Sequence, residues 1–468
     1  MLKYLLQKIA LAESQRSEHV KSEDDFEIPT TSHKVTDYVV QRHKAEKSGE
    51  HYDFRLLIDG KAISFASRKL LPAELHRKYL QVQQPSHTKE YMSFSGTIPA
   101  GYGKGEVEIA HQGKAIVASS PNKLHVLIPD GPVSGAYHMI RTQDKNFIAM
   151  KQQDPTFYYH EKKGTYSTKI PDYVLDDKDW IASDKIDGAQ NIVHIDQQTG
   201  KPGIVSVRKS VTGDLIIKNA HIPHISSITF PKKYRGMAFR AELHVPGKDF
   251  STLSGILNSG PVKAVETQEK VGKIHMAPFQ VLKEPGGKEN PLSYEKQLEL
   301  LKQLETDVAS PFIRVPSYTK ENKKEFIKSV LKRGGEGVVI GHKDALNESK
   351  FYKIKKNYDF TFKIIGATEG QGRLKGKGIG GFIIADKEGR TVGVVGSGLN
   401  DKIRQDAYQN FDNYKDKLIK TQAMEPTALF SVRHPVFMGF ATDSNEADKL
   451  ETSEESRILS FLQKINLK

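Results

Sequence analysis

The sequence predicts a multidomain protein built from β and α+β parts: a β-barrel or sandwich at the N-terminus, an α+β domain in the middle and a small β-barrel at the C-terminus. Its 468 residues suit about two to four domains of roughly 100–200 residues each. Short apolar runs, separated by turn residues at intervals of roughly 8–12 positions, predict strands over residues 33–158 and again after residue 357. A long helical pattern interrupts the strands between these regions.

The N-terminal β domain carries candidate metal ligands. Residues 1–32 are predicted to be a lead-in to this domain. Polar and apolar residues then alternate over 51–55, so a strand would point His51, Asp53 and Arg55 to one side. With His43 they could form a His/His/Asp site for a divalent metal, beside an arginine for phosphate. The same side chains could equally form a solvated strand face.

The α+β domain is predicted over residues 172–356, after a linker at 159–171. Its longest predicted helix covers residues 294–308, where four leucines share one face: Leu298, Leu300, Leu301 and Leu304. A shorter helix is predicted over residues 323–333, before a double-glycine turn and another strand. Strands and helices in this order are typical of a mixed α+β domain.

Lys185 in this domain is a candidate nucleophile, because it begins a Lys-Ile-Asp-Gly sequence. A lysine attacks phosphorus only as the neutral amine, so its environment must lower its pKa or supply a base. A turn ending in Gly188 could present Lys185 in a cleft, with Asp187 directed toward the same pocket. A hairpin turn with surface charges would explain the four residues equally well.

Four charged residues further along the chain favour the catalytic interpretation. Glu242 lies in one predicted strand, and Glu336 begins another after the double-glycine turn. Lys353 and Lys355 are two positions apart, so a strand would place both amines on one face. This set of groups suits attack on a nucleoside triphosphate. One amine would be the nucleophile, two carboxylates would bind a metal and two amines would bind phosphates.

The third region, residues 357–468, contains strands and a Gly-Lys-rich stretch at 370–381. This stretch lacks the spacing of a phosphate-binding P-loop, and Gly378 follows Lys377 where Ser or Thr would be needed. We therefore expect a basic loop between two strands. Small closed β domains with this pattern often bind nucleic acid.

Composition narrows the classes of partner. The formal net charge is +13, from 70 Lys and Arg against 57 Asp and Glu. This charge favours a polyanion such as DNA as the partner. A solvated lysine-rich surface would give the same charge. The chain has no cysteine, which excludes disulfides and thiolate zinc sites. No apolar run approaches the roughly 18 residues of a membrane span. We expect a cytoplasmic monomer without a membrane segment.

The motifs of the central domain resemble, in order and spacing, those of the covalent nucleotidyltransferase superfamily, which includes ATP-dependent DNA ligases, RNA ligases and capping enzymes. The matching segments are Lys185-Ile-Asp-Gly, Arg208, Glu242, Phe279, Glu336-Gly-Val-Val and Lys353-Ile-Lys355. The resemblance implies that Lys185 takes AMP from ATP and releases pyrophosphate. The AMP would pass to a DNA 5′-phosphate, and attack by a 3′-hydroxyl would seal the nick.

The same resemblance implies roles for individual residues. The ATP site would contain Lys185, Gly188, Arg208, Glu242, Phe279, Lys353 and Lys355. Within it, Phe279 would stack on adenine, and Glu242 would contact the ribose or a metal. Glu336 would bind Mg²⁺ or Mn²⁺. Lys353 and Lys355 would hold the α-phosphate, and Asp187 would join them and Lys185 as a catalytic residue.

Both flanking regions resemble parts of the bacterial ligase D family. Residues 357 to about 440 are similar to its OB domain, which would clamp the DNA backbone. Two N-terminal segments resemble its 3′-phosphoesterase domain, namely VVQRHKAEKSGEHYDFRLLIDG and HTKEYMSFSGTIPAGYGKGEVEI. That domain would trim 3′-ribonucleotides and 3′-phosphates. The implied Mn²⁺ ligands are His43, His51 and Asp53. The implied phosphate contacts are Arg55, Lys69, His87 and Tyr91, and of these Arg55 and His87 would be catalytic.

The sequence departs from these families at several positions. Gln190 stands where the superfamily usually has an arginine, so nick binding would differ. Ala441 and Ser444 replace residues that orient the leaving pyrophosphate, so self-adenylylation would be slow unless nearby lysines substitute. In the N-terminal domain two extra residues separate His43 from His51, and Tyr79 replaces a phosphate-contacting arginine.

Two other functions compete with the ligase. One is a different covalent nucleotidyltransferase, such as an RNA ligase, and the ligase-D-like third region argues against it. The other is a non-catalytic or weakly active protein that binds DNA ends, which the intact set of Lys185, Glu242, Glu336 and Lys353 argues against. ATP is expected rather than NAD because NAD-dependent ligases commonly carry a cysteine zinc site. An end-bridging protein is a candidate partner, and no polymerase domain is expected in this chain.

Overall fold

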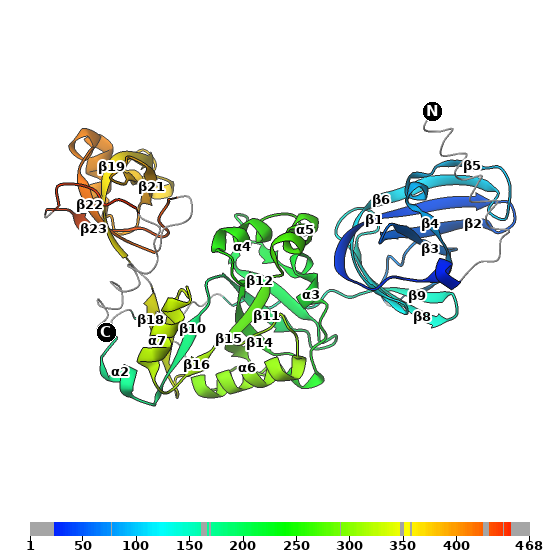
Figure 1. Cartoon of the computed structure of the whole chain (residues 1–468), viewed down its shortest axis with the longest axis horizontal. Coiled ribbons are helices and arrows are strands. Elements are labelled where there is room, and N and C mark those ends of the chain that lie inside the picture. Colours follow the sequence, from blue (N-terminus) through cyan, green and yellow to red (C-terminus); the bar gives the residue numbers. More distant parts are fainter. Residues whose placement is uncertain are drawn as a thin grey trace. The chain divides into compact units, whose positions relative to one another are not determined.

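Four β-sheets make up most of the chain in the computed structural model (Figure 1). The structure describes residues 23–75, 77–160, 166–167, 170–290, 292–346, 351–355, 358–424, 430–442 and 444–450. Most of the predicted lead-in, part of the predicted linker and the end of the C-terminal region lie outside these residues. The mostly-β character with few helices agrees with the predicted fold class.

Contacts divide the chain into two compact units. The first contains residues 1–162, 187–292 and 296–315, and the second contains 163–186, 293–295 and 316–468. The boundaries at 33–158, 172–356 and 357–468 stay predictions. In the part of the chain that the structure describes, no helix is long and apolar enough to cross a membrane.

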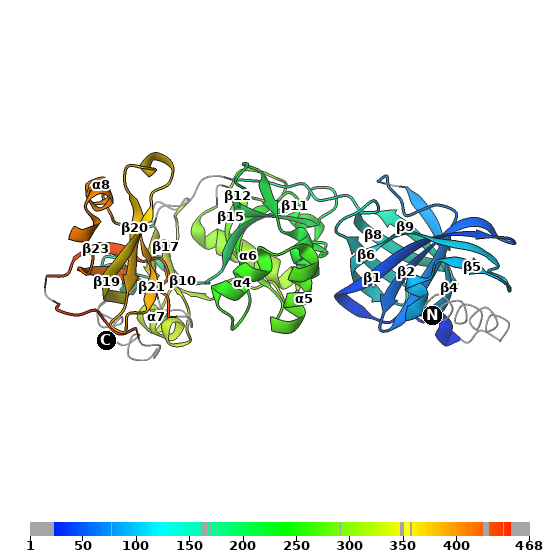
Figure 2. The same cartoon turned by 90° about the horizontal axis from the view of Figure 1, so that it is seen from above.

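The N-terminal sheet of the first unit has nine strands in the order β1-β2-β3-β4-β9-β8-β7-β6-β5. These strands are β1 (Thr31–Ala45), β2 (Gly49–Ile58), β3 (Lys61–Ser67), β4 (Lys78–Thr88), β5 (Gly96–Ile98), β6 (Gly105–Ser120), β7 (Lys123–Ile128), β8 (Gly135–Gln143) and β9 (Asn146–Lys151). Strand β1 also pairs with β6, so the hydrogen-bonded pairings return to the strand from which they began (Figure 2). Alternating apolar residues such as Phe54, Leu56 and Phe65 build the core of this sheet.

A second sheet of the first unit has the order β13-β12-β11-β14-β15. Its strands are β11 (Ala189–Ile195), β12 (Pro202–Lys209), β13 (Leu215–Ile217), β14 (Ala238–His244) and β15 (His275–Lys283). The helices α3 (Pro223–Ser226), α4 (Phe250–Leu257), α5 (Pro261–Val271) and α6 (Tyr294–Val308) connect or follow them. The helix predicted at 294–308 is confirmed, and its Leu301 and Leu304 join the buried core because their spacing puts them on one face.

The second unit begins with a four-stranded sheet in the order β16-β10-β17-β18. Its strands are β10 (Trp180–Lys185), β16 (Tyr318–Thr319), β17 (Gly337–His342) and β18 (Phe351–Lys355), with helices α2 (Tyr173–Asp176) and α7 (Lys323–Lys332). Apolar residues of α7, such as Ile327 and Leu331, pack with Trp180 and Val338 of the sheet. The helix predicted at 323–333 is therefore confirmed, apart from its last residue.

A five-stranded sheet with the order β21-β20-β19-β22-β23 completes the second unit. Its elements are β19 (Tyr358–Glu369), β20 (Ile379–Ala385), β21 (Thr391–Val395), α8 (Asp401–Gln409), β22 (Leu418–Ala423) and β23 (Val436–Phe440). Phe362, Phe382 and Ile419 lie in its core. Residues 370–378 of the Gly-Lys-rich stretch lie between β19 and β20, as expected for a loop between strands, whereas its last three residues belong to β20.

Candidate functional sites

The hairpin of β1 and β2 brings three candidate metal ligands together. His43 lies directly opposite His51 in the antiparallel ladder, and Asp53 lies opposite Gln41. Because side chains two residues apart share a strand face, Asp53 points to the same side as His51. Ligand atoms of His43, His51 and Asp53 all lie within 4.8 Å of one another. We call these three residues the metal-ligand cluster; within the described residues it is the one such group.

Hydrogen bonds fix how the two histidines face Asp53. His43 Nε2 lies 2.8 Å from the carbonyl oxygen of Gly103, and His51 Nδ1 lies 2.9 Å from that of Gly49. A carbonyl can only accept, so in the neutral ring each of these nitrogens carries the proton. The other nitrogens, His43 Nδ1 and His51 Nε2, then offer lone pairs and lie 3.7 Å from the Asp53 carboxylate. This is the arrangement that orients histidines for a metal.

Asp53 is buried and ionised. Burial raises the pKa of its carboxyl group, but the charge of Arg55 and the neighbouring His43 and His51 outweigh that effect and bring the pKa to about 2. Two imidazole nitrogens and a carboxylate form a nitrogen and oxygen donor set that suits a divalent transition metal. The residues present therefore fit the divalent metal that the resemblance implies.

Arg55 is buried beneath this cluster, with 3% of its surface exposed. Its Nη2 donates to Asp53 Oδ2 at 2.9 Å, its Nε donates to Gln41 at 2.6 Å, and its Nη1 donates to Ser64 at 2.5 Å. All three nitrogens thus contact protein side chains, and the arginine positions the Asp53 carboxylate. Its predicted role in phosphate binding stays a prediction.

We expect Arg55→Met to lower the free energy of unfolding by roughly 3–5 kcal/mol, because it leaves the buried Asp53 carboxylate without its ion-pair partner. Urea unfolding of the full chain in EDTA measures this change. Arg42→Met is the matched control, since Arg42 pairs with Glu50 on the same hairpin with both side chains at least 40% exposed. It should change the stability by less than about 1 kcal/mol. Equal effects of the two variants would contradict the structural role of Arg55.

His87 and Tyr91 lie next to Arg55, whereas Lys69 lies elsewhere. His87 Nδ1 is 3.1 Å from Arg55 Nη1, so it accepts that hydrogen bond and leaves its proton on Nε2. Its ring lies 4.5 Å from that of Tyr91, which is itself buried. The Nζ atom of Lys69 instead lies 5.2 Å from the centre of the Tyr79 ring.

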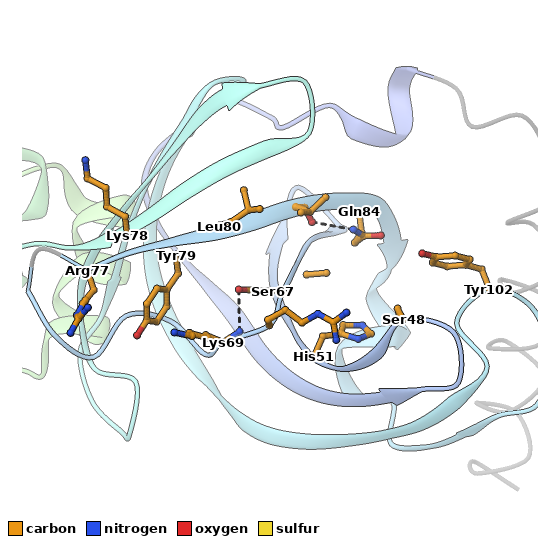
Figure 3. Close-up of a pocket in the computed structure, with 13 residues that line it drawn as sticks. Ser48, His51, Ser67, Lys69, Arg77, Lys78, Tyr79, Leu80, Gln84 and Tyr102 are labelled. Atoms are coloured by element: carbon orange, nitrogen blue, oxygen red, sulfur yellow. Dashed lines mark hydrogen bonds between the residues drawn. The ribbon is translucent and has the colours of Figure 1, made fainter.

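A pocket of about 760 Å³ opens beside the metal-ligand cluster (Figure 3). His51 of the cluster lines it together with Ser48, Ala66, Ser67, Arg68, Lys69, Arg77, Lys78, Tyr79, Leu80, Val82, Gln84 and Tyr102. Among these residues, the resemblance to the phosphoesterase domain implies roles for His51 and Lys69 and places Tyr79 in the position of a phosphate-contacting arginine. It indicates no role for Tyr102 or Leu80, and their exposure is a property of the folded chain.

A second group of charged residues forms in the four-stranded sheet of the second unit. Lys185, the last residue of β10, lies opposite Gly337 in β17, and Gly337 lies opposite Lys355 in β18. Glu336 immediately precedes β17 and is buried between the two lysines. Its Oε2 accepts a hydrogen bond from Lys185 Nζ, and its Oε1 lies 2.7 Å from Lys355 Nζ.

Lys353 belongs to the same group, which we call the lysine cluster: Lys185, Glu336, Lys353 and Lys355. Burial lowers the pKa of Lys353, and the charges of Lys355 and Lys185 lower it further, while Glu336 acts in the opposite direction. Its Nζ lies 5.8 Å from the centre of the Tyr166 ring. The cluster concentrates three amines around one carboxylate, which is an environment for binding phosphates.

Glycines allow strands to approach closely at both motifs. A side chain at Gly337 would overlap the backbone of Ile354, so the register between β17 and β18 needs a glycine there. In the first unit, a Cβ at Gly188 would lie 2.9 Å from Glu242 Cγ. Neither packing role could be read from the sequence, because a close approach is a property of two strands.

The remaining predicted ligase residues belong to the first unit. Glu242 lies in β14 opposite Gln190 of β11, and Phe279 lies half-buried in β15. Arg208 is exposed at the end of β12. Asp187 and Gly188 precede β11. Their predicted roles toward ATP stay predictions.

The structure also shows an ion pair that the motifs did not indicate. Arg333, just after α7, contacts Asp184 at 2.5 Å. Asp184 precedes Lys185 on β10, and its backbone N–H donates to the carbonyl of Ser317. The pair therefore holds the end of β10 to the segment that leads into Glu336.

Comparisons with known proteins find similarity to the ligase D proteins. A family model for the DNA ligase D 3′-phosphoesterase domain matches residues 41–166. The chain is 31% identical over 182 residues to the multifunctional non-homologous end joining DNA repair protein LigD of Mycobacterium tuberculosis, covering 36% of this chain and 24% of that protein. It is 36% identical over 112 residues to LigD of Pseudomonas aeruginosa, covering 22% and 13%. The chain thus spans about a quarter or less of these relatives, and its resemblance to ligase D is confirmed.

Solved structures of ligases also align with the chain, at low similarity. A Lig E DNA ligase aligns with a TM-score of 0.45 and 17% identity over 60% of this chain and 100% of the ligase. A mycobacterial DNA ligase D complexed with ATP and MES aligns with a TM-score of 0.34 and 16% identity, over 60% and 94%.

Proposed function

We propose that this relative of the ligase D proteins is an ATP-dependent DNA ligase whose N-terminal domain prepares 3′ ends for sealing. The N-terminal domain would be a β-barrel and the last sheet an OB-type domain that holds the DNA backbone. The observation that carries the sealing activity is the lysine cluster, in which two strands flank β17 and bring Lys185 and Lys355 to the buried Glu336.

In the first step, the Nζ atom of Lys185 would attack the α-phosphorus of ATP. A nitrogen–phosphorus bond forms, the bond to the leaving pyrophosphate breaks, and the amine loses a proton to the solvent. The Nζ atom of Lys185 donates a hydrogen bond to Glu336, so this contact must open before the amine can attack. Lys353 and Lys355 would compensate the negative charge that develops on the phosphate.

The AMP would then pass from Lys185 to the 5′-phosphate of a nicked strand. Attack of the 3′-hydroxyl on that phosphate forms the phosphodiester and releases AMP. Glu336 would hold Mg²⁺ or Mn²⁺, and Glu242 would contact the ribose or a metal. The bound ion would supply Lewis-acid chemistry at the triphosphate. Phe279 would stack on the adenine and Arg208 would contact the nucleotide.

The metal-ligand cluster supports removal of 3′-phosphates and 3′-ribonucleotides. His43, His51 and Asp53 would hold Mn²⁺, which when bound would polarise a phosphate oxygen. His87 carries its proton on Nε2 and is oriented by Arg55, so it could donate a hydrogen bond to the phosphate or a proton to the leaving oxygen. Lys69 would attract the phosphate from the neighbouring pocket.

A nicked duplex with a 3′-phosphate and a 5′-phosphate tests both activities in one reaction. The full chain with ATP and Mn²⁺ should seal it, after conversion of the 3′-phosphate to a hydroxyl. A nick with a 3′-hydroxyl should be sealed directly, and NAD should not replace ATP. Binding of both nicks without sealing or trimming would instead identify a non-catalytic DNA-end-binding protein and overturn the proposal.

A further inference from the structure

We propose that the pocket beside the metal-ligand cluster binds an unpaired 3′ tail of a DNA strand, and that Tyr79 and Tyr102 are the surfaces on which its bases stack. The inference rests on the proposed function, because the pocket contains His51 of that cluster. It adds a substrate class, tailed rather than blunt ends, and two residues that select it.

The charge of the pocket suits a phosphate backbone. Four of its thirteen lining residues are cations, namely Arg68, Lys69, Arg77 and Lys78, and none is acidic. Arg77 pairs with Glu74 outside the lining, but both side chains are more than 60% exposed, so the pair contributes little and can open. Cations around a groove without carboxylates attract a polyanion and make its binding sensitive to salt.

The apolar surface of the pocket suits bases that are not paired. Tyr102 is 67% exposed and Leu80 is 50% exposed, although both line a recess where apolar groups are usually covered. Tyr79 lies next to Leu80 on β4 and is half-buried. In a duplex the bases already stack on one another, so only unpaired bases can offer their faces to such side chains.

The positions of these residues fit a strand that passes the metal-ligand cluster. Figure 3 shows Tyr79 and Tyr102 toward opposite ends of the pocket, with His51 between them. At the Tyr79 end, the Nζ atom of Lys69 lies 5.2 Å from the centre of the ring, so a cation and a stacking surface occur together. A volume of about 760 Å³ also exceeds what a lone phosphate would need.

Fluorescence anisotropy in EDTA tests this inference with labelled duplexes that carry a short thymidine 3′ tail, a matching 5′ tail or a blunt end, all with 3′-hydroxyls. The full chain should bind the 3′-tailed duplex about tenfold more tightly than the blunt one. Tyr79→Ala and Tyr102→Ala should each reduce this preference several-fold, while Tyr79→Phe retains it because the ring persists. Lys78→Ala should reduce the salt dependence of tail binding by about 0.7 in the logarithmic slope.

Tyr173→Ala provides the matched control, since Tyr173 is 60% exposed on α2 and does not line the pocket. It should leave the tail preference unchanged. Unfolding midpoints of the Tyr79 and Tyr102 variants equal to that of the original protein would exclude misfolding. The inference would be overturned if the chain bound tailed and blunt duplexes with equal affinity. It would also be overturned if neither alanine variant changed the tail preference. Because EDTA prevents metal-dependent turnover, this result does not depend on whether the chain removes 3′-phosphates.

Discussion

Lys185→Ala should abolish transfer of label from α-labelled ATP to the protein and reduce nick sealing by more than about a thousandfold, because no other group would form the covalent bond to AMP. The label is measured on denaturing gels after incubation with ATP and Mg²⁺ or Mn²⁺. Lys185 is partly exposed at the end of β10, and Glu336 keeps its contact with Lys355, so truncation of Lys185 should lower the unfolding midpoint less than Arg55→Met does.

Lys178→Ala is the matched control for this experiment. Lys178 precedes β10 by two residues, is exposed and pairs with Glu321 at 2.8 Å. Its truncation should leave both labelling and sealing unchanged. Label retained in Lys185→Ala would identify another nucleophile, and absence of label in the unaltered protein would reject the proposed ligase mechanism.

His51→Ala should reduce removal of a 3′-phosphate by more than about a hundredfold while sealing of a nick with a 3′-hydroxyl continues. The substitution removes the Nε2 lone pair that faces Asp53 and leaves two of the three candidate ligands. A higher Mn²⁺ concentration should restore part of the activity, because the loss would lie in metal affinity. Phosphate release and strand sealing are measured on the two substrates separately.

Arg42→Ala provides the comparison on the same hairpin, since Arg42 pairs with Glu50 at the surface. It should leave both activities unchanged. If trimming survived in His51→Ala at low Mn²⁺, the metal-ligand cluster would not be the phosphoesterase site. Equal loss of trimming and sealing would show that the substitution damages the whole chain.

Local geometry explains which predictions from the sequence hold in the structure. Side chains two residues apart on a strand share a face, so the expected convergence of His51, Asp53 and Arg55 is confirmed by the contacts of Asp53 with both neighbours. The helix at 294–308 is confirmed for a similar reason, because leucines at helical spacing must be buried together. Both patterns depend on a few neighbouring residues and the fixed period of the backbone.

The extent of Arg55 burial could not be predicted in this way. The sequence indicated an arginine available for phosphate, whereas the structure places its guanidinium among Asp53, Gln41 and Ser64. Gln41 belongs to β1 and Ser64 to β3, so three strands must pair in one register before these contacts exist. The same holds for the carbonyls of Gly49 and Gly103 that orient the histidines.

By itself, the sequence determined that this protein has strand-rich regions around a mixed α+β segment, which residues carry reactive groups, and which of them share a strand face. Only the tertiary structure decided that Glu336 pairs with Lys185, 151 positions earlier in the chain, and with Lys355 on the neighbouring strand. It also decided that Tyr79 and Tyr102 line one pocket with His51. Backbone periodicity acts over a few residues, whereas contacts between distant segments depend on which strands pair and in what register.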